Sequence, residues 1–326
     1  MAAPASPIVV PPQPWTGRFD GEGAEHRRWW QVVTPYALRT LPAPASAGPG
    51  ASSRTRAAVL LGFGSDEGVR RNQGRVGAAA GPAAIRAALA PLAFHLSRDV
   101  HDAGDVPVAG QSLEAGQARA GLAITRLLDA SQLPVVLGGG HETAFASYLG
   151  IAGSAAVREG LRVGVLNLDA HFDLRDEPVP SSGTPFLQMA RAEAAAGREL
   201  QYAVVGISEP NNTGALFRTA QELRVDYLLD EDSSATAAHA FVAAFLAQVD
   251  ALHLSIDLDV LPASEAPGVS APAAYGVPLP VVSAVCGQVA ASGKLLHLDV
   301  AELNPRFDID GRTAKVAARL VNRLLG

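Results

Sequence analysis

The sequence contains one cysteine, Cys286, so no disulfide can form within the chain, and such a composition is typical of a reducing compartment. It has no apolar run of membrane-spanning length, and its first residues have neither the cationic nor the apolar region of a secretory signal. Lysine and arginine form no basic stripe, and the formal net charge is −6. We therefore expect a cytoplasmic protein that binds neither nucleic acid nor a membrane.

Hydrophobic residues make up 48% of the 326 residues, which is enough for a sizeable core. Apolar runs that predict strands alternate with segments that predict helices. Strands are expected at 57–63, 100–106, 133–137, 163–168, 202–206, 225–229, 251–256 and 295–300, the longer helices at 113–130, 186–196, 239–247, 281–291 and 313–325, and a polar loop at 65–75. This alternation predicts an α/β fold whose mainly parallel, doubly wound sheet is built from right-handed crossovers.

The first 56 residues differ from the rest, because they hold all three tryptophans and two stretches rich in proline and alanine. We interpret 1–56 as an N-terminal extension with a tail, a tryptophan-rich segment and a linker. The tryptophan-rich segment is expected to dock onto the main body or onto a neighbouring subunit. Residues 57–326 are expected to form a single domain.

The most informative stretch follows the strand predicted at 163–168, which runs directly into Asp169, His171 and Asp173. In an extended backbone alternate residues project from the same face, so two carboxylates and an imidazole would converge. Charged side chains at the end of an apolar strand are costly unless they are neutralised. A divalent cation would neutralise them.

Other predicted strands end in similar residues. His141 follows three glycines, which we interpret as a tight turn that aims its imidazole, and Asp257, Asp259 and Glu302 follow two later strands. Parallel strands bring their carboxyl ends to one edge of a sheet, so these side chains are expected to meet. The other six histidines, His253 and His297 among them, show no comparable spacing and are interpreted as surface or packed residues.

This set of side chains predicts two metal ions. A single aspartate at a strand end is more often a turn or helix cap, but that interpretation is improbable for six correlated residues. Four aspartates and two histidines are too many for one tetrahedral zinc, and an oxygen-rich set favours manganese. Two such ions that share carboxylates can hold a water and deliver hydroxide at neutral pH.

Several motifs resemble the ureohydrolase family, which includes arginase, agmatinase and formimidoylglutamase. The metal-type motifs are Gly138–Glu142 (GGGHE), Asn167–Asp173 (NLDAHFD) and Leu254–Asp259 (LSIDLD), and Asp299–Pro305 (DVAELNP) resembles the family's substrate-site stretch. The segments that most resemble formimidoylglutamase are Gly64–Gly77, Ser181–Phe186, Pro210–Thr213 and Ala266–Pro272. The resemblance covers nearly the whole chain.

The resemblance implies an arginase-like three-layer α/β sandwich, a catalytic domain at 57–326 and a homo-oligomer, either trimer or hexamer. It implies two Mn²⁺ ions per subunit, with the ligands His141, Asp169, His171, Asp173, Asp257 and Asp259. The implied reaction is hydrolysis of N-formimidoyl-L-glutamate to L-glutamate and formamide, a step of histidine degradation. The alternatives are another amidine or guanidine hydrolase (of the agmatinase or guanidinobutyrase type), a non-catalytic metal-binding scaffold and a phosphatase.

Two positions depart from the family pattern. Ser182 stands where arginase has a histidine that is thought to shuttle protons, so that role must be met otherwise or be unnecessary. Val260–Ala263 replaces the Asp-Pro that usually follows the second pair of aspartates, and we expect this change to affect the loop alone.

The expected mechanism starts from hydroxide that bridges the two cations and attacks the formimidoyl carbon. Asp173 is expected to accept the proton of the water and relay it to the departing amine. Glu302 is expected to hydrogen-bond the amidinium; its alternative interpretation is a structural ion-pair carboxylate.

Selectivity for a dicarboxylate amidine is expected to come from Arg175, because a guanidinium can bind a carboxylate through two parallel hydrogen bonds. The weaker candidates for substrate binding are Arg71, Asn72, Arg75, Asn211 and Asn212. The alternative interpretation of each is a solvated loop residue.

Overall fold

The computed structural model describes residues 9–38 and 56–326. In this part of the chain nine strands form one sheet in the order β1-β3-β2-β4-β9-β8-β5-β6-β7, and every pair of neighbours is parallel. The strands are β1 Thr34–Pro35, β2 Ala58–Gly64, β3 Val100–Pro107, β4 Leu133–Gly138, β5 Val163–Leu168, β6 Gln201–Ile207, β7 Asp226–Leu229, β8 Ala251–Asp257 and β9 Leu295–Ala301. The expected doubly wound parallel sheet is confirmed.

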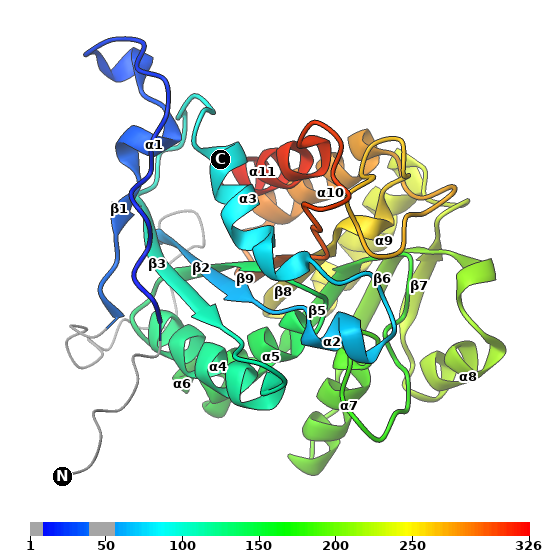
Figure 1. Cartoon of the computed structure of the whole chain (residues 1–326). Coiled ribbons are helices and arrows are strands. Elements are labelled where there is room, and N and C mark those ends of the chain that lie inside the picture. Colours follow the sequence, from blue (N-terminus) through cyan, green and yellow to red (C-terminus); the bar gives the residue numbers. More distant parts are fainter. Residues whose placement is uncertain (1–8, 39–55) are drawn as a thin grey trace.

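Helices cover both faces of the sheet, which makes three layers (Figure 1). The helices α3 Gly81–Leu89, α9 Ala235–Gln248, α10 Leu279–Ser292 and α11 Arg312–Leu325 pack on one face, and α4 Leu113–Asp129, α5 Thr143–Gly153 and α7 Pro185–Ala195 pack on the other. The remaining α-helices are α1 Trp29–Val32, α2 Glu67–Arg71, α6 Ala155–Arg158 and α8 Gly214–Glu222. Because the central strands are covered on both faces, they are apolar almost throughout.

The strand order determines where the carboxyl ends lie. The four central strands β4, β9, β8 and β5 are consecutive neighbours. Residues at or next to the ends of these strands are in register: Leu137 pairs with Val300, Val300 with Ile256, and Ile256 with Leu168. The residues that follow these strands therefore begin at the same level of one edge, although they are far apart in the sequence.

Two sequence predictions were wrong in detail. The segment predicted as the polar loop 65–75 contains α2, in which Glu67 accepts hydrogen bonds from Arg70 and Arg71 at the i+3 and i+4 spacings that stabilise a helix. Helix α9 begins at Ala235 rather than at residue 239. The hydroxyl of Ser234 accepts a hydrogen bond from the backbone N–H of Ala237 (3.2 Å) and so caps this earlier start.

The tryptophan-rich segment lies on the main body of the same chain. The Trp29 side chain is fully buried. Its ring centroid lies 6.5 Å from that of Trp15 and 5.7 Å from that of Phe94. Its Nε1 donates to Asn322 Oδ1 in α11 (3.0 Å). Residues 9–38 also supply β1 beside β3, whereas most of the predicted tail and linker, at 1–8 and 39–55, lies outside the described residues.

None of the helices in the described ranges combines the length and the apolar character that crossing a bilayer requires.

Candidate metal centre

His141 reaches the sheet edge through the glycine turn that follows β4. Gly140 N donates to Ser65 O (2.9 Å), and a Cβ on Gly139 would lie 1.7 Å from the same oxygen. Only a residue without a side chain permits such a close approach of two backbones. The turn predicted before His141 is present, and the imidazole is 1% exposed.

Asp169 lies between the two histidines of the predicted set. Its Oδ2 is 3.2 Å from His141 Nδ1, and its Oδ1 is 3.5 Å from His171 Nδ1. The two oxygens of one carboxylate thus face two different imidazoles. A carboxylate in this position can bridge two cations.

The other predicted ligands divide between the two histidines. His141 Nδ1 lies 2.8 Å from Asp173 Oδ2 and 3.1 Å from Asp257 Oδ2, while His171 Nδ1 lies 3.1 Å from Asp259 Oδ2. The ligand atoms form two groups, each within 4.8 Å, and the groups share Asp169. The first group is His141, Asp169, Asp173 and Asp257, and the second is Asp169, His171 and Asp259.

The backbone of this stretch is not extended, contrary to the prediction. Strand β5 ends at Leu168, and Asp173 has a φ of +50°, which is the left-handed region. Aspartate tolerates this region better than most residues, because its short side chain can hydrogen-bond locally. The side chains meet because Asp169 continues the strand and Asp173 returns toward His141 through this turn.

The electrostatics of the site are those of crowded carboxylates. Burial, together with the charge of Asp169, raises the pKa of Asp173 to about 6. Burial and the charge of Asp259 raise the pKa of Asp257 well above its usual range. Although burial lowers the pKa of His141, Asp257 and the other surrounding carboxylates raise it well above its usual range. Without a counter-charge, these groups cannot all be ionised together.

The donor set fits two divalent cations. Oδ1 of Asp259 and Oε2 of Glu302 are buried and have no hydrogen-bond partner among the described residues. Buried oxygens without partners are costly, and bound ions or substrate would satisfy them. Four aspartates and two imidazoles in two overlapping groups match the ligand types of a binuclear centre.

Glu302 lies beside this centre at the end of β9. Its Oε1 accepts a hydrogen bond from the backbone N–H of His141 (2.9 Å), and its backbone has a φ of +69°. Burial and the nearby Glu142 raise the pKa of Glu302 to about 8. The second oxygen remains available to a ligand.

A cavity of about 210 Å³ opens onto the centre. Besides five of the predicted ligands and Glu302, its lining includes Asn72, Arg175, Ser182 and Asn211. Asn72 Nδ2 donates to Ser182 Oγ (3.1 Å). The Arg175 side chain is exposed, and its guanidinium forms no hydrogen bond or ion pair with the residues that the structure describes. The cavity thus combines carboxylates at its base with an available cation in its wall.

Three of the weaker candidates do not line this cavity. Arg71 is bound to Glu67 and Glu114, and Arg75 donates to the carbonyls of Val269 and Ser270 with its guanidinium 3.9 Å from the ring centroid of Phe307. Asn212 donates to the carbonyls of Ala170 and Ser208 and accepts from the backbone N–H of Phe172, so it supports the metal-site loop.

Sequence reasoning missed the support beneath Asp169. Asn167 Nδ2 donates to Asp169 Oδ2 (2.8 Å) and lies 3.2 Å from the hydroxyl of Tyr202, which itself donates to Phe172 O (3.0 Å). The available signal was a buried asparagine inside an apolar strand, two residues before Asp169 and on the same face.

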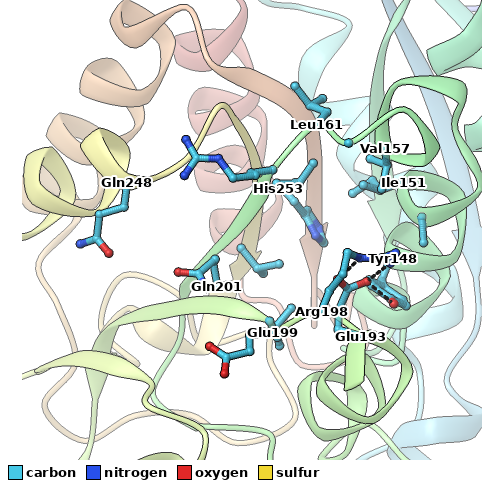
Figure 2. Close-up of a pocket in the computed structure, with 16 residues that line it drawn as sticks. Tyr148, Ile151, Val157, Leu161, Glu193, Arg198, Glu199, Gln201, Gln248 and His253 are labelled. Atoms are coloured by element: carbon cyan, nitrogen blue, oxygen red, sulfur yellow. Dashed lines mark hydrogen bonds and ion pairs between the residues drawn. The ribbon is translucent and has the colours of Figure 1, made fainter. Parts of the chain in front are cut away.

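A larger cavity, of about 600 Å³, lies toward the amino ends of β5 and β6. Figure 2 shows its lining, in which Arg198 and the hydroxyl of Tyr148 both bind Glu193. This cavity contains none of the residues predicted as ligands or substrate contacts. The concentration of ionisable groups makes the smaller cavity the candidate site.

Known proteins resemble this chain over most of its length. The chain is 57% identical over 311 residues to a formimidoylglutamase of Nocardia farcinica, covering 95% of each chain. It is 55% identical over 321 residues to a formimidoylglutamase of Rhodococcus jostii, covering 98% of this chain and 96% of the relative.

Solved structures share the fold. A Trypanosoma cruzi formiminoglutamase with Mn²⁺ superposes with a TM-score of 0.74 at 24% identity, covering 87% of this chain and 97% of the other. An arginase of Bacillus subtilis superposes with a TM-score of 0.72 at 24% identity, covering 83% of this chain and 99% of the other. The expected arginase-like fold is therefore confirmed. The sequence model of the arginase family matches residues 56–326, and the chain belongs to this family.

Proposed function

We propose that this chain hydrolyses N-formimidoyl-L-glutamate to L-glutamate and formamide at a centre of two divalent cations. The observation that carries the proposal is Asp169, whose two oxygens face two histidine groups at the base of a cavity that also presents Arg175. Relatives that are more than half identical over 95% or more of this chain bear the name formimidoylglutamase, which supports the same substrate.

The residues proposed to hold the cations are His141, Asp169, His171, Asp173, Asp257 and Asp259. The chemistry that two divalent cations supply is the activation of water at neutral pH. The oxygen-rich ligand set supports manganese rather than zinc.

Two carboxylates of the chain act on the substrate, one as a proton carrier and one as a hydrogen-bond acceptor. Asp173 accepts a proton from the attacking water and passes it to the nitrogen of glutamate as the bond between that nitrogen and the formimidoyl carbon breaks. Glu302 accepts a hydrogen bond from the amidinium through Oε2 and so orients it. Ser182 also lines the cavity and accepts a hydrogen bond from Asn72, but its hydroxyl has no pKa near neutrality and so cannot store a proton as a histidine does.

The substrate's two carboxylates must avoid the acidic base of the cavity. Arg175 is the proposed partner of one of them, and Asn72 and Asn211 are further hydrogen-bond donors in the lining. We also propose a reducing, cytoplasmic location, which a single buried cysteine supports, and a homo-oligomer, which light scattering would test.

Metal analysis with a substrate panel tests the reaction. We expect two Mn²⁺ ions per chain, with formamide released from formimidoylglutamate and no product from arginine, agmatine or guanidinobutyrate. Removing the metal with a chelator should abolish turnover, and Mn²⁺ should restore it. Turnover of agmatine alone would assign a different substrate, and two bound ions without any turnover would indicate a scaffold.

Replacing Arg175 by alanine tests the carboxylate contact. We expect KM for formimidoylglutamate to rise roughly 10–100-fold with little change in kcat, because a hydrogen bond to a charged group contributes about 1.5–3 kcal/mol. Steady-state kinetics measures both constants.

The matched control is Arg191→Ala, which removes an exposed arginine that pairs with Asp176 and does not line the cavity. A second variant that tests Arg175 is Gly183→Ala. The added Cβ would lie 2.7 Å from Arg175 Cδ and would displace the arginine side chain. An unchanged KM in both Arg175→Ala and Gly183→Ala would remove Arg175 from substrate binding.

A further inference from the structure

The cavity of about 600 Å³ has no role in the proposed reaction. Its volume falls within the range of about 300–1,000 Å³ that is usual for small-molecule sites. Its lining includes the first residues of β5 and β6, Val163 and Gln201, whereas the metal centre follows the last residue of β5. A molecule bound here would therefore occupy a different place from the substrate.

Much of the cavity wall is apolar. The apolar side chains come from α5, α6, β5 and the loops beside them, and they include Ile151, Val157, Leu161, Val163, Val165 and Leu200. An ordered water needs two to four polar partners, which such a wall does not supply. An apolar ring, by contrast, gains free energy when the same wall removes it from water. The wall therefore favours an organic ligand over ordered water.

The arginines and glutamates of the lining are already paired. Each has a partner of opposite charge, in the pairs Arg198–Glu193 (2.6 Å), Arg162–Asp250 (2.8 Å) and Glu199–Arg224. A charged ligand would lose its hydration without meeting an unpaired opposite charge, and this loss is costly. The ligand that fits the cavity is therefore uncharged.

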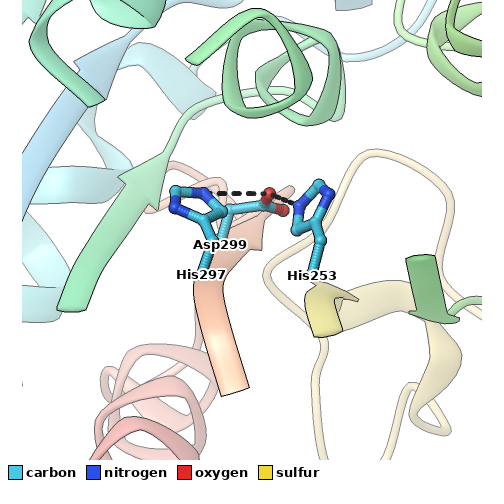
Figure 3. A group of neighbouring side chains, drawn as sticks. All are labelled: His253, His297 and Asp299. Carbon is cyan, nitrogen blue, oxygen red and sulfur yellow. Dashed lines mark hydrogen bonds and ion pairs between the residues drawn. The ribbon is translucent and has the colours of Figure 1, made fainter. Parts of the chain in front are cut away.

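One polar atom of the lining has no partner. His253 in β8 is fully buried, and its side chain is one of those that line the cavity (Figure 2). Its Nε2 lies 2.5 Å from Asp299 Oδ2, and Figure 3 shows this carboxylate between His253 and His297. Its Nδ1 is buried and has no hydrogen-bond partner among the residues that the structure describes. A ligand that reached Nδ1 would satisfy a group that is costly to leave unpaired.

The charge of Asp299 determines which ligand group suits His253 Nδ1. Burial alone would raise the pKa of Asp299, but the adjacent His253 holds that pKa below its usual range. An ionised carboxylate can only accept, so Nε2 of His253 carries a proton. Nδ1 is then an acceptor on the neutral ring and a donor on the imidazolium. A hydroxyl can donate and accept, so it can bond to Nδ1 in either state.

We propose that this cavity binds an uncharged aromatic molecule with one hydroxyl group. The ring lies against the apolar wall, and the hydroxyl bonds to His253 Nδ1. This site goes beyond the proposed function and does not depend on it. The competing interpretations are a cavity that holds only mobile water and a cavity that a second copy of the chain covers. Both of them predict that no aromatic molecule binds.

Fluorescence titration of the full-length protein with three naphthalene probes tests the proposal. 2-Naphthol should bind at one molecule per chain. Naphthalene has no hydrogen-bonding group and leaves Nδ1 unsatisfied, so it should bind about 10-fold more weakly. 2-Naphthoate carries a charge that the cavity does not neutralise, and its affinity should be at least about 10-fold lower than that of 2-naphthol.

Two substitutions locate the probe. Ala152→Phe, in the wall formed by α5, should abolish measurable binding of 2-naphthol, because the added ring would occupy the space of the probe. The matched control is Ala156→Phe in α6, an exposed position that does not line the cavity, and its affinity should equal that of the wild type. His253→Phe should bind 2-naphthol and naphthalene equally well, since it removes the nitrogen that distinguishes them.

The proposal would be overturned if 2-naphthol did not bind, if 2-naphthoate bound more tightly, or if Ala152→Phe bound 2-naphthol as the wild type does. Equal affinities of the wild type for 2-naphthol and naphthalene would also overturn it, because the hydroxyl would then make no contact. If Ala152→Phe does not fold, Val157→Phe, at a lining position in α6, takes its place. If His253→Phe does not fold, the two affinities of the wild type decide alone.

Discussion

Replacing Asp169 by alanine should leave the protein with neither cation and lower kcat/KM by at least about 10³-fold, since activation of water by bound metal contributes several kcal/mol. The reason is geometric. Oδ2 of Asp169 faces His141 and Oδ1 faces His171, so the substitution removes a ligand from both groups at once. It also leaves the buried amide of Asn167 without its 2.8 Å acceptor. Elemental analysis of the purified variant, together with its kinetics, measures both effects.

The comparison variant is Asp259→Ala. Asp259 belongs only to the group of His171, so this variant should keep about one cation per chain. Two cations retained in Asp169→Ala would show that the carboxylate does not bridge. One cation retained in both variants would place Asp169 in a single site.

Replacing Trp29 by alanine should destabilise the protein by about 3–5 kcal/mol, the usual cost of truncating a large buried aromatic residue. For a chain of this size we expect the midpoint of thermal unfolding to fall by roughly 4–7 °C. The indole is fully buried against Trp15 and Phe94, and its N–H donates to Asn322, so the substitution also strands that acceptor. Thermal unfolding at fixed protein and metal concentration measures the shift.

Trp30→Ala provides the matched control. The Trp30 indole is only partly buried, and its Nε1 donates to Arg18 O within the same N-terminal segment. The Trp30→Ala substitution should lower the midpoint of thermal unfolding much less than Trp29→Ala does. Equal shifts for the two tryptophans would mean that docking of the segment, rather than the burial of Trp29, sets the stability.

The sheet and the positions of the candidate ligands could be predicted because both depend on local patterns. Each central strand is an apolar run that ends in a polar residue, and a parallel sheet brings such ends to one edge whatever their separation in sequence. The sequence also contains a second local pattern of polar residues within strands. His253 and Ser255, and likewise His297 and Asp299, are spaced two apart inside buried strands, which places each pair on one face.

Features that depend on tertiary contacts could not be predicted. Arg75 was a substrate candidate by composition, yet its guanidinium is bound to Val269 and Ser270, nearly 200 residues away, and lies over Phe307. The left-handed backbone of Asp173 could not be predicted either, because no local pattern distinguishes it from an extended residue. Such positions are fixed by packing against distant loops.

The two-residue strand β1 has a consequence for shortened forms of this protein. The family match begins at residue 56, and a chain cut there would lose both β1 and the bridge between Val10 and Asp105. The outer side of β3, a strand of eight residues, would then present unpaired backbone N–H and C=O groups to the solvent. Exposed edges of this kind recruit strands from other molecules, so such a cut would invite aggregation even though the metal-binding residues are untouched.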